Sequence, residues 1–166
     1  MLVLGIDPGT ATTGYGLVNQ TSDGRLEAIA FGAILTPKNL PMPDRLAQLY
    51  QELNEVILLH RPDSSAVEKL FFQKNVKTAI SVGQGRGVVL LALAQAGLPI
   101  GEYTPNEIKQ AVTGYGSADK HQMQEMVRML LELPERPKPD DAADALAVAI
   151  CHLHNSRYQQ LIEENK

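Results

Sequence analysis

Residues 4–16 read LGIDPGTATTGYG, and they place one carboxylate, Asp7, between an apolar run and a Pro-Gly pair. The apolar residues 3–6 have the composition of a buried strand, and the Pro-Gly pair ends it. A second apolar run at 13–18 follows closely enough to fold back as a hairpin. The stretch therefore predicts two paired strands, with Asp7 at the end of the first, either capping the turn or facing a cleft.

Length and composition limit the possible architectures. A chain of 166 residues with 44% hydrophobic content can bury one core, so we expect a single domain over residues 1–157 and a C-terminal tail, 158–166. Cys151 is the only cysteine, which excludes a disulfide within the chain and favours a reducing compartment. The longest apolar run, 88–94, is too short to span a bilayer, so we expect a cytoplasmic protein that does not associate with membranes.

Charge is unevenly distributed along the chain. The formal net charge of -4 argues by itself against a nucleic-acid partner. However, residues 69–86 contain four basic residues and no acidic one, whereas residues 132–144 contain five acidic residues. The acidic segment is a candidate metal site, and two bound divalent cations would neutralise the formal charge of the chain.

The hydrophobic pattern along the chain predicts three strands followed by alternating helices and strands. At 104–107, TPNE is typical of a helix start, with Thr104 as N-cap and Glu107 completing a capping box. The predicted order is strands at 3–6, 13–18 and 26–35, a helix at 46–57, a strand at 65–70, a helix at 76–96, a strand at 99–103, a helix from Thr104, a helix capped by Ser117 and ending near Leu131, and a helix from about Pro139 to Arg157. This order predicts an α/β fold in which a three-strand meander precedes the alternating part.

The helix predicted at 76–96 contains glycines at positions 83, 85 and 87. Each glycine costs about 1 kcal/mol relative to alanine in a helix interior, so we expect a packing reason, most simply the close approach of another backbone. Ala79, Gly83 and Gly87 recur every four residues and therefore share one face. A phosphate-binding loop is the weaker alternative, because GQGRG lies inside a helical pattern.

Acidic residues also occur on two further elements. Glu68 lies in a short β-rich segment, where an unpaired charge is costly to bury, although a salt bridge to a lysine would explain it. In PDDAADALAVAI, Asp141 and Asp144 are three apart and project from one helix face, among alanines that allow close packing on a sheet. Helix geometry alone also permits a pair of Asp140 with Asp144, and acids in a first turn are ordinary partners of the helix dipole.

Together these carboxylates predict a two-metal site. Hard divalent cations such as Mg²⁺ prefer oxygen ligands, and carboxylates on two strands and one helix can hold two ions a few ångströms apart. Such a pair serves phosphoryl transfer without a serine, cysteine or histidine nucleophile. We therefore expect His121, His152 and His154 to be surface or structural residues, although His121 could contact phosphate, and Cys151 to be a buried small hydrophobic residue.

Five segments occur together in the chain: GIDPGTATTGYG, VEKLFFQKN, VGQGRGV, IKQAVTGYGSADKHQM and DAADALAVAI. In order and spacing they resemble the RuvC family, the bacterial Holliday-junction resolvases of the ribonuclease H-like superfamily, from Leu2 to about His154. The resemblance implies a ribonuclease H-like α/β fold with a mixed five-stranded sheet flanked by helices. It also implies a homodimeric endonuclease that uses two Mg²⁺ ions per site, or Mn²⁺ in their place. Such an enzyme nicks two strands of a four-way DNA junction symmetrically and leaves 5′-phosphate and 3′-hydroxyl ends.

Residue roles follow from the same resemblance. The carboxylates that it implies as catalytic and metal-binding are Asp7, Glu68, Asp141 and Asp144. It implies DNA contacts for Lys109 and Lys120, stacking on junction bases for Phe71, and a dimer interface at Ala79, Gly83 and Gly87. The partners that it implies are a four-way DNA junction, a second copy of the chain, and the branch-migration proteins RuvA and RuvB.

Two features depart from the family pattern, and three other functions are alternatives to a resolvase. Many relatives are basic, so the acidic net charge predicts weaker non-specific DNA binding, and Asp140 adds an acid beside the expected ligand pair. The alternatives are a ribosomal-RNA-maturation nuclease of the same superfamily, an actin-like ATP-binding protein, and a junction-binding module without catalysis. The segments GYGSADK and DAADALA favour the resolvase over the first alternative. A length of 166 residues is too short for the two lobes of the second, and the four filled carboxylate positions argue against the third.

Overall fold

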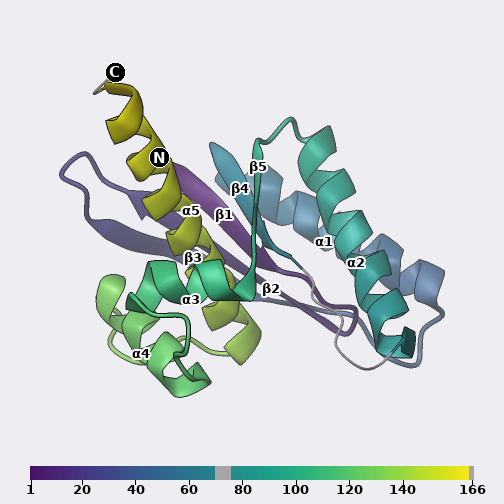
Figure 1. Cartoon of the computed structure of the whole chain (residues 1–166). Coiled ribbons are helices and arrows are strands. Elements are labelled where there is room, and N and C mark those ends of the chain that lie inside the picture. The colour runs from purple at the N-terminus through teal and green to yellow at the C-terminus, as the bar shows by residue number, and fades with distance from the viewer. Residues whose placement is uncertain (70–75, 165–166) are drawn as a thin grey trace.

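The computed structural model describes residues 1–69 and 76–164, with side chains for 1–69 and 78–156. Its centre is a five-stranded sheet in the order β3-β2-β1-β4-β5 (Figure 1). The strands are β1 (Leu2–Asp7), β2 (Thr12–Gln20), β3 (Leu26–Leu35), β4 (Ser64–Glu68) and β5 (Ile100–Tyr103). The first three pair antiparallel, whereas β4 and β5 run parallel to β1, so the predicted meander and mixed sheet are confirmed.

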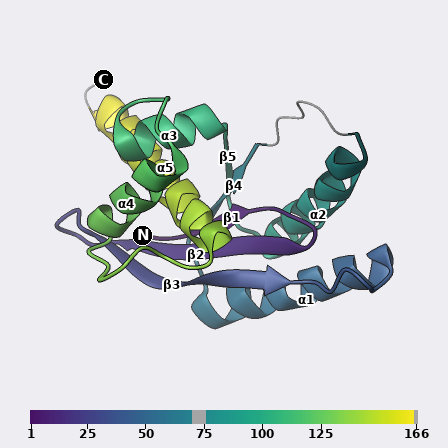
Figure 2. The ribbon, with the colours of Figure 1, turned by 90° about the horizontal axis from the view of Figure 1, so that it is seen from below.

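Helices cover both faces of this sheet (Figure 2). They are α1 (Met42–His60), α2 (Val76–Gln95), α3 (Pro105–Thr113), α4 (Lys120–Leu130) and α5 (Asp140–Glu164). Leu4 and Ile6 of β1 share a core with α1 and α2, while Val3 shares a core with α3, α4 and α5. Because β1 is buried on both faces, its sequence is apolar throughout rather than alternating.

Helix α5 lies directly on the strands because glycines of the sheet face small residues of the helix. A β-carbon built on Gly5 would stand 2.1 Å from the carbonyl oxygen of Ala145 and 2.6 Å from the amide nitrogen of Ala149. One built on Gly16 would stand 2.8 Å from the side chain of Leu146. No side chain fits at these glycines, so the close packing predicted from the alanines of α5 is confirmed.

Two helix boundaries differ from prediction. Thr104 caps α3 through the expected reciprocal bonds with Glu107, but the cap of α4 is Asp119 rather than Ser117. Asp119 accepts from the amide of Gln122 at 2.8 Å, and the Gln122 side chain accepts from the amide of Asp119 at 2.9 Å. Three residues after Ser117 stands Lys120, which has no acceptor to complete such a box.

At the other end of the chain, α5 continues to Glu164, beyond the predicted end near Arg157. Residues 158–164 read YQQLIEE, which contains neither proline nor glycine to stop a helix.

The glycines of α2 divide into two groups. Gly85 is buried against the first turn of the sheet, where an added β-carbon would stand 2.8 Å from the carbonyl oxygen of Gly9. The predicted close approach of a backbone is therefore confirmed for Gly85. For Gly83 and Gly87, no heavy atom of the described residues outside the surrounding turns of α2 lies within 4 Å of such a β-carbon, and both glycines are exposed.

Among the helices of the described residues, none is long and apolar enough to cross a membrane.

Candidate active site

Two acidic side chains come from the ends of neighbouring parallel strands. Asp7 is the last residue of β1 and Glu68 the last of β4, and the register that pairs Ile6 with Val67 sets the two acids side by side. The two carboxyl groups are close enough for the charge of Glu68 to help raise the pKa of Asp7. The carboxyl ends of parallel strands meet at one edge of a sheet, so Asp7 and Glu68 lie together at this edge.

The other two acids come from the first turns of α5. Gly14 is the register partner of Asp7 on β2, and a β-carbon built on it would stand 1.9 Å from the carbonyl oxygen of Asp141. The start of α5 therefore rests on the strand next to Asp7. Asp144 lies one turn further along, on the same side of the helix.

The four predicted carboxylates influence one another electrostatically. The pKa of Asp7 is raised to about 8, first by burial and then by the nearby charges of Glu68, Asp144 and Asp141. Burial also raises the pKa of Glu68, and the charge of Asp144 raises it further. The pKa of Asp144 rises mainly through burial, against the lowering effect of Lys120. This edge of the sheet therefore carries more negative charge than its surroundings compensate.

Asp140, the additional acid, is paired with a lysine at the edge of this cluster. Its carboxylate lies 2.9 Å from the Lys120 ammonium and accepts a second bond, also 2.9 Å, from the Gln124 amide. These contacts, led by the bond from Lys120, lower the pKa of Asp140. Asp140 is exposed, and its side chain is held by a lysine and a glutamine.

Both predicted DNA-contacting lysines lie beside the carboxylates. A cavity of about 210 Å³ is bounded by Glu68 and Asp144, by the side chains of Lys109 and Lys120, and by an apolar wall that includes Ile108 and Met123. The Lys120 ammonium is 3.9 Å from an Asp144 carboxylate oxygen. Acids and lysines thus share one concave surface, which is an arrangement suited to a phosphate held near metal ligands.

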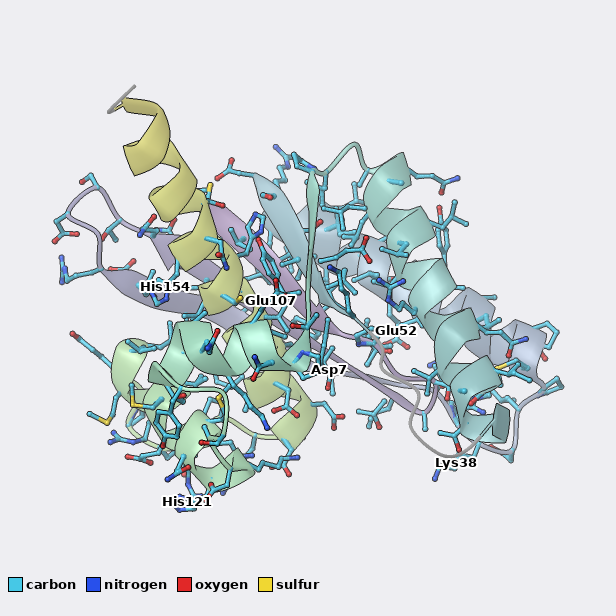
Figure 3. All side chains as sticks on the ribbon, in the orientation of Figure 1. Asp7, Lys38, Glu52, Glu107, His121 and His154 are labelled. Atoms are coloured by element: carbon cyan, nitrogen blue, oxygen red, sulfur yellow. The ribbon has the colours of Figure 1, made fainter. Side chains whose placement is uncertain are left out.

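Of the remaining predicted site residues, one falls outside the described residues and three lie on another helix. Phe71 is outside the described residues. Ala79, Gly83 and Gly87 are on α2, which packs in the layer opposite α5. In Figure 3 Asp7 lies near the centre of the molecule, whereas His121 and Lys38 lie at its periphery. His121 is exposed and Cys151 is a buried free thiol, in agreement with their predicted roles.

Sequence reasoning missed the contribution of Gly14. Its signal was available, because glycines at 14 and 16 repeat with the period of a strand and so leave part of one face of β2 without side chains. A bare strand face calls for a helix with small residues, which the alanine-rich start of α5 supplies. The pattern does not show which helix packs on which strand.

The sequence and the fold match known proteins. The family described as "Crossover junction endodeoxyribonuclease RuvC" matches residues 3–152. A protein of that name from Syntrophomonas wolfei is 55% identical over 165 residues, which cover 99% of this chain and 95% of the relative. The structure of RuvC from Thermus thermophilus superposes with a TM-score of 0.89 at 36% identity, covering 96% of this chain and 97% of that one.

The same Thermus thermophilus protein in complex with a Holliday junction substrate superposes with a TM-score of 0.87 at 34% identity, covering 95% of this chain and 96% of that one. These matches favour the resolvase over the ribosomal-RNA-maturation and actin-like alternatives. The chain belongs to the RuvC family of crossover junction endodeoxyribonucleases.

Proposed function

We propose that this enzyme resolves four-way DNA junctions by Mg²⁺-dependent hydrolysis at a site formed by Asp7, Glu68, Asp141 and Asp144. The observation that carries the proposal is the convergence of these four carboxylates from two strand ends and one helix, where burial and mutual repulsion raise the pKa of Asp7 to about 8. Uncompensated carboxylates of this kind are what a cation site requires. The family relationship and the junction complex of the Thermus thermophilus relative supply the substrate class.

The donor set fits Mg²⁺, because every candidate ligand is a carboxylate oxygen and Mg²⁺ is a hard cation. We infer two ions per site, with Mn²⁺ able to replace Mg²⁺. When bound, such a pair lowers the pKa of an attacking water and stabilises the leaving oxygen of a phosphodiester. In the described part of the chain, no three acidic, histidine or cysteine side chains stand at the spacing of a metal-ligand cluster.

Two lysines complete the site. Lys109 and Lys120 border the cavity that Glu68 and Asp144 also line, so their ammonium groups can hold the scissile phosphate against the carboxylates. Lys120 is exposed and held by Asp140, which keeps its charge at the rim of the cavity. Cleavage of the bond between the phosphorus and the 3′ oxygen would leave 5′-phosphate and 3′-hydroxyl ends.

A second copy of the chain is needed to cut two strands symmetrically. We infer that the face of α2 formed by Ala79, Gly83 and Gly87 is the dimer interface. Gly83 and Gly87 are exposed, and on the same helix Ile80 and Leu91 expose 60% and 51% of their surface. Exposed apolar residues beside glycines favour close contact with another chain. Stacking of Phe71 on junction bases, and assistance by RuvA and RuvB, belong to the same proposal.

The experiment that tests this function compares a labelled four-way junction with a linear duplex of matched sequence. With Mg²⁺ the protein should nick two opposite strands of the junction and leave the duplex intact, and without a divalent cation it should cut neither. Equal cleavage of both substrates, or cleavage in the presence of a chelator, would contradict the proposal.

A further inference from the structure

We propose that His152 is a positioning residue, which forms with Ser64 and Tyr103 a hydrogen-bonded clamp that fixes α5, and with it Asp141 and Asp144, relative to the strand that carries Glu68. The inference rests on the proposed function, because it concerns how the metal-binding acids are held in place. None of the three clamp residues belongs to the carboxylate site itself.

Both ring nitrogens of His152 are bonded to the sheet. Nε2 lies 2.8 Å from the hydroxyl oxygen of Ser64 on β4, and Nδ1 lies 2.9 Å from the phenol oxygen of Tyr103 on β5. The Tyr103 and His152 rings also meet edge to face, with centroids 5.8 Å apart. One side chain of α5 is thus joined to two parallel strands at once.

A single tautomer satisfies every group of the clamp. Ser64 donates its hydroxyl proton to the carbonyl oxygen of Pro99 at 3.4 Å and accepts from Nε2–H, while Nδ1 accepts from the hydroxyl of Tyr103. Burial lowers the pKa of His152 and raises that of Tyr103 to about 12, so the neutral ring and the protonated phenol persist at neutral pH. The clamp is therefore fully bonded without a buried charge.

The sheet is shaped to receive this ring. A β-carbon built on Gly101 of β5 would stand 2.4 Å from Nδ1 of His152. Any side chain at position 101 would displace the imidazole. Ser64 exposes only 7% of its surface, which excludes substrate access and with it a nucleophilic role for this Ser-His pair.

The clamp is well placed to set the spacing of the acids. His152 follows Asp144 by eight residues, about 12 Å along a helix. Ser64 precedes Glu68 by four residues, about 13 Å along a strand. The helix and the strand therefore run similar distances from the clamp to the two sides of the site. A shift of α5 at His152 would therefore move Asp144 relative to Glu68.

Packing and hydrogen bonds act together on the position of α5. Between the clamp and the site, the small residues Ala145 and Ala149 lie on Gly5, and the longer side chain of Leu146 lies on Gly16. Contacts between small residues hold two backbones close but oppose a shift along the helix axis less than interlocked long side chains do. The directional bonds of His152 add a constraint to this packing.

The test consists of two measurements. The first is Mn²⁺ binding to the whole protein without DNA, monitored as the loss of the electron paramagnetic resonance signal of the free ion. The second is the Mg²⁺ dependence of junction cleavage. His152→Ala should raise both half-saturating metal concentrations about tenfold, the lower end of the effect expected when groups that orient metal ligands are lost. His152→Gln, which can still bond to Ser64, should recover part of the loss.

His154→Ala is the matched control. His154 lies on the same helix, but its Nδ1 bonds to the carbonyl oxygen of Ala111 on α3 at 2.9 Å, away from β4. It should lower the melting temperature and leave both metal midpoints within about twofold. If His152→Ala lowers only the melting temperature, or if both variants shift the metal midpoints equally, the clamp has no positioning role.

Two milder variants keep the test decisive if His152→Ala does not fold. Ser64→Ala and Tyr103→Phe each remove one hydrogen bond and leave the ring in place, and each should give a smaller shift in the same direction. Unchanged midpoints in both would overturn the inference. Failure of the unmodified protein to bind Mn²⁺ or to cut a junction would instead count against the proposed function.

Discussion

The carbonyl oxygen of Asp141 occupies the space that a side chain on Gly14 would need, since a β-carbon there would stand only 1.9 Å from it. Gly14 is also the register partner of Asp7. The missing side chain on β2 is therefore what lets the start of α5 reach the end of β1. The arrangement joins a strand acid and a helix acid without any direct bond between them.

Gly14→Ala should lower cleavage at least about a hundredfold and reduce thermal stability, because the first turn of α5 has to move away from Asp7. Single-turnover cleavage of a labelled junction and a melting curve measure the two effects. The matched control is Gly32→Ala on β3, where the added carbon would meet the far end of the Tyr15 side chain, which can move aside. Near-normal cleavage by Gly14→Ala would show that the close approach is not needed.

Asp140, Asp141 and Asp144 should differ sharply when each is replaced by asparagine. Asp141→Asn and Asp144→Asn should abolish cleavage at saturating Mg²⁺. Asp140→Asn should retain activity within roughly tenfold, a barrier change of about 1.4 kcal/mol, because Asp140 is bonded to Lys120 rather than to the other acids. An inactive Asp140→Asn with a nearly normal Asp141→Asn would mean that the ligand pair is Asp140 with Asp144.

The metal-free protein should lose stability as the pH rises toward 8. Asp7 has a pKa of about 8 when folded and an ordinary value of 3.8, so the folded state binds more protons than the unfolded state between these values. Stability is then highest below the ordinary value and falls as the pH rises through the folded one.

At pH 8 in a chelator, Asp7→Asn should therefore melt several degrees above the unmodified protein, since about 1 kcal/mol corresponds to roughly 2–4 °C at this size. Mg²⁺ should raise the melting temperature of the unmodified protein and have a smaller effect on the variant. A lower melting temperature for Asp7→Asn under these conditions would contradict the electrostatic account of the site.

Gly83→Leu should convert a dimer into monomer or aggregate, as measured by light scattering. Gly83 is exposed, and outside its own helix turn no described atom lies within 4 Å of a β-carbon built on it, so we expect the leucine to disturb contact with a second copy. Gln51→Leu places the same side chain on an exposed position of α1 and should leave the dimer intact. An unchanged dimer for Gly83→Leu would move the interface to another surface.

Local patterns predicted much of this structure. The apolar run ending at Asp7 and the reciprocal cap of Thr104 with Glu107 depend only on neighbours in the sequence, and both appear as expected. The cap of α4 was misplaced because Ser117 and Asp119 are both good N-caps, and only Asp119 has a partner three residues later. The correct choice required the partner residue to be considered, not only the cap.

Tertiary relationships could not be predicted in this way. The four acids were identified from their residue types and from the family resemblance, but the role of Gly14 depends on α5 crossing β2. The pairing of Lys120 with Asp140, and the bonds of His152 to Ser64 and Tyr103, join residues that are 20 to 88 positions apart or lie on different elements. No local periodicity encodes such contacts.

The most direct test of the metal-site account separates junction binding from junction cleavage in Asp7→Asn and Glu68→Gln. Both substitutions remove a metal-binding charge and leave Lys109 and Lys120 in place, so both variants should bind a four-way junction as tightly as the unmodified protein. Neither should nick the junction in Mg²⁺. Loss of binding in parallel with cleavage, or appreciable nicking by either variant, would contradict the account.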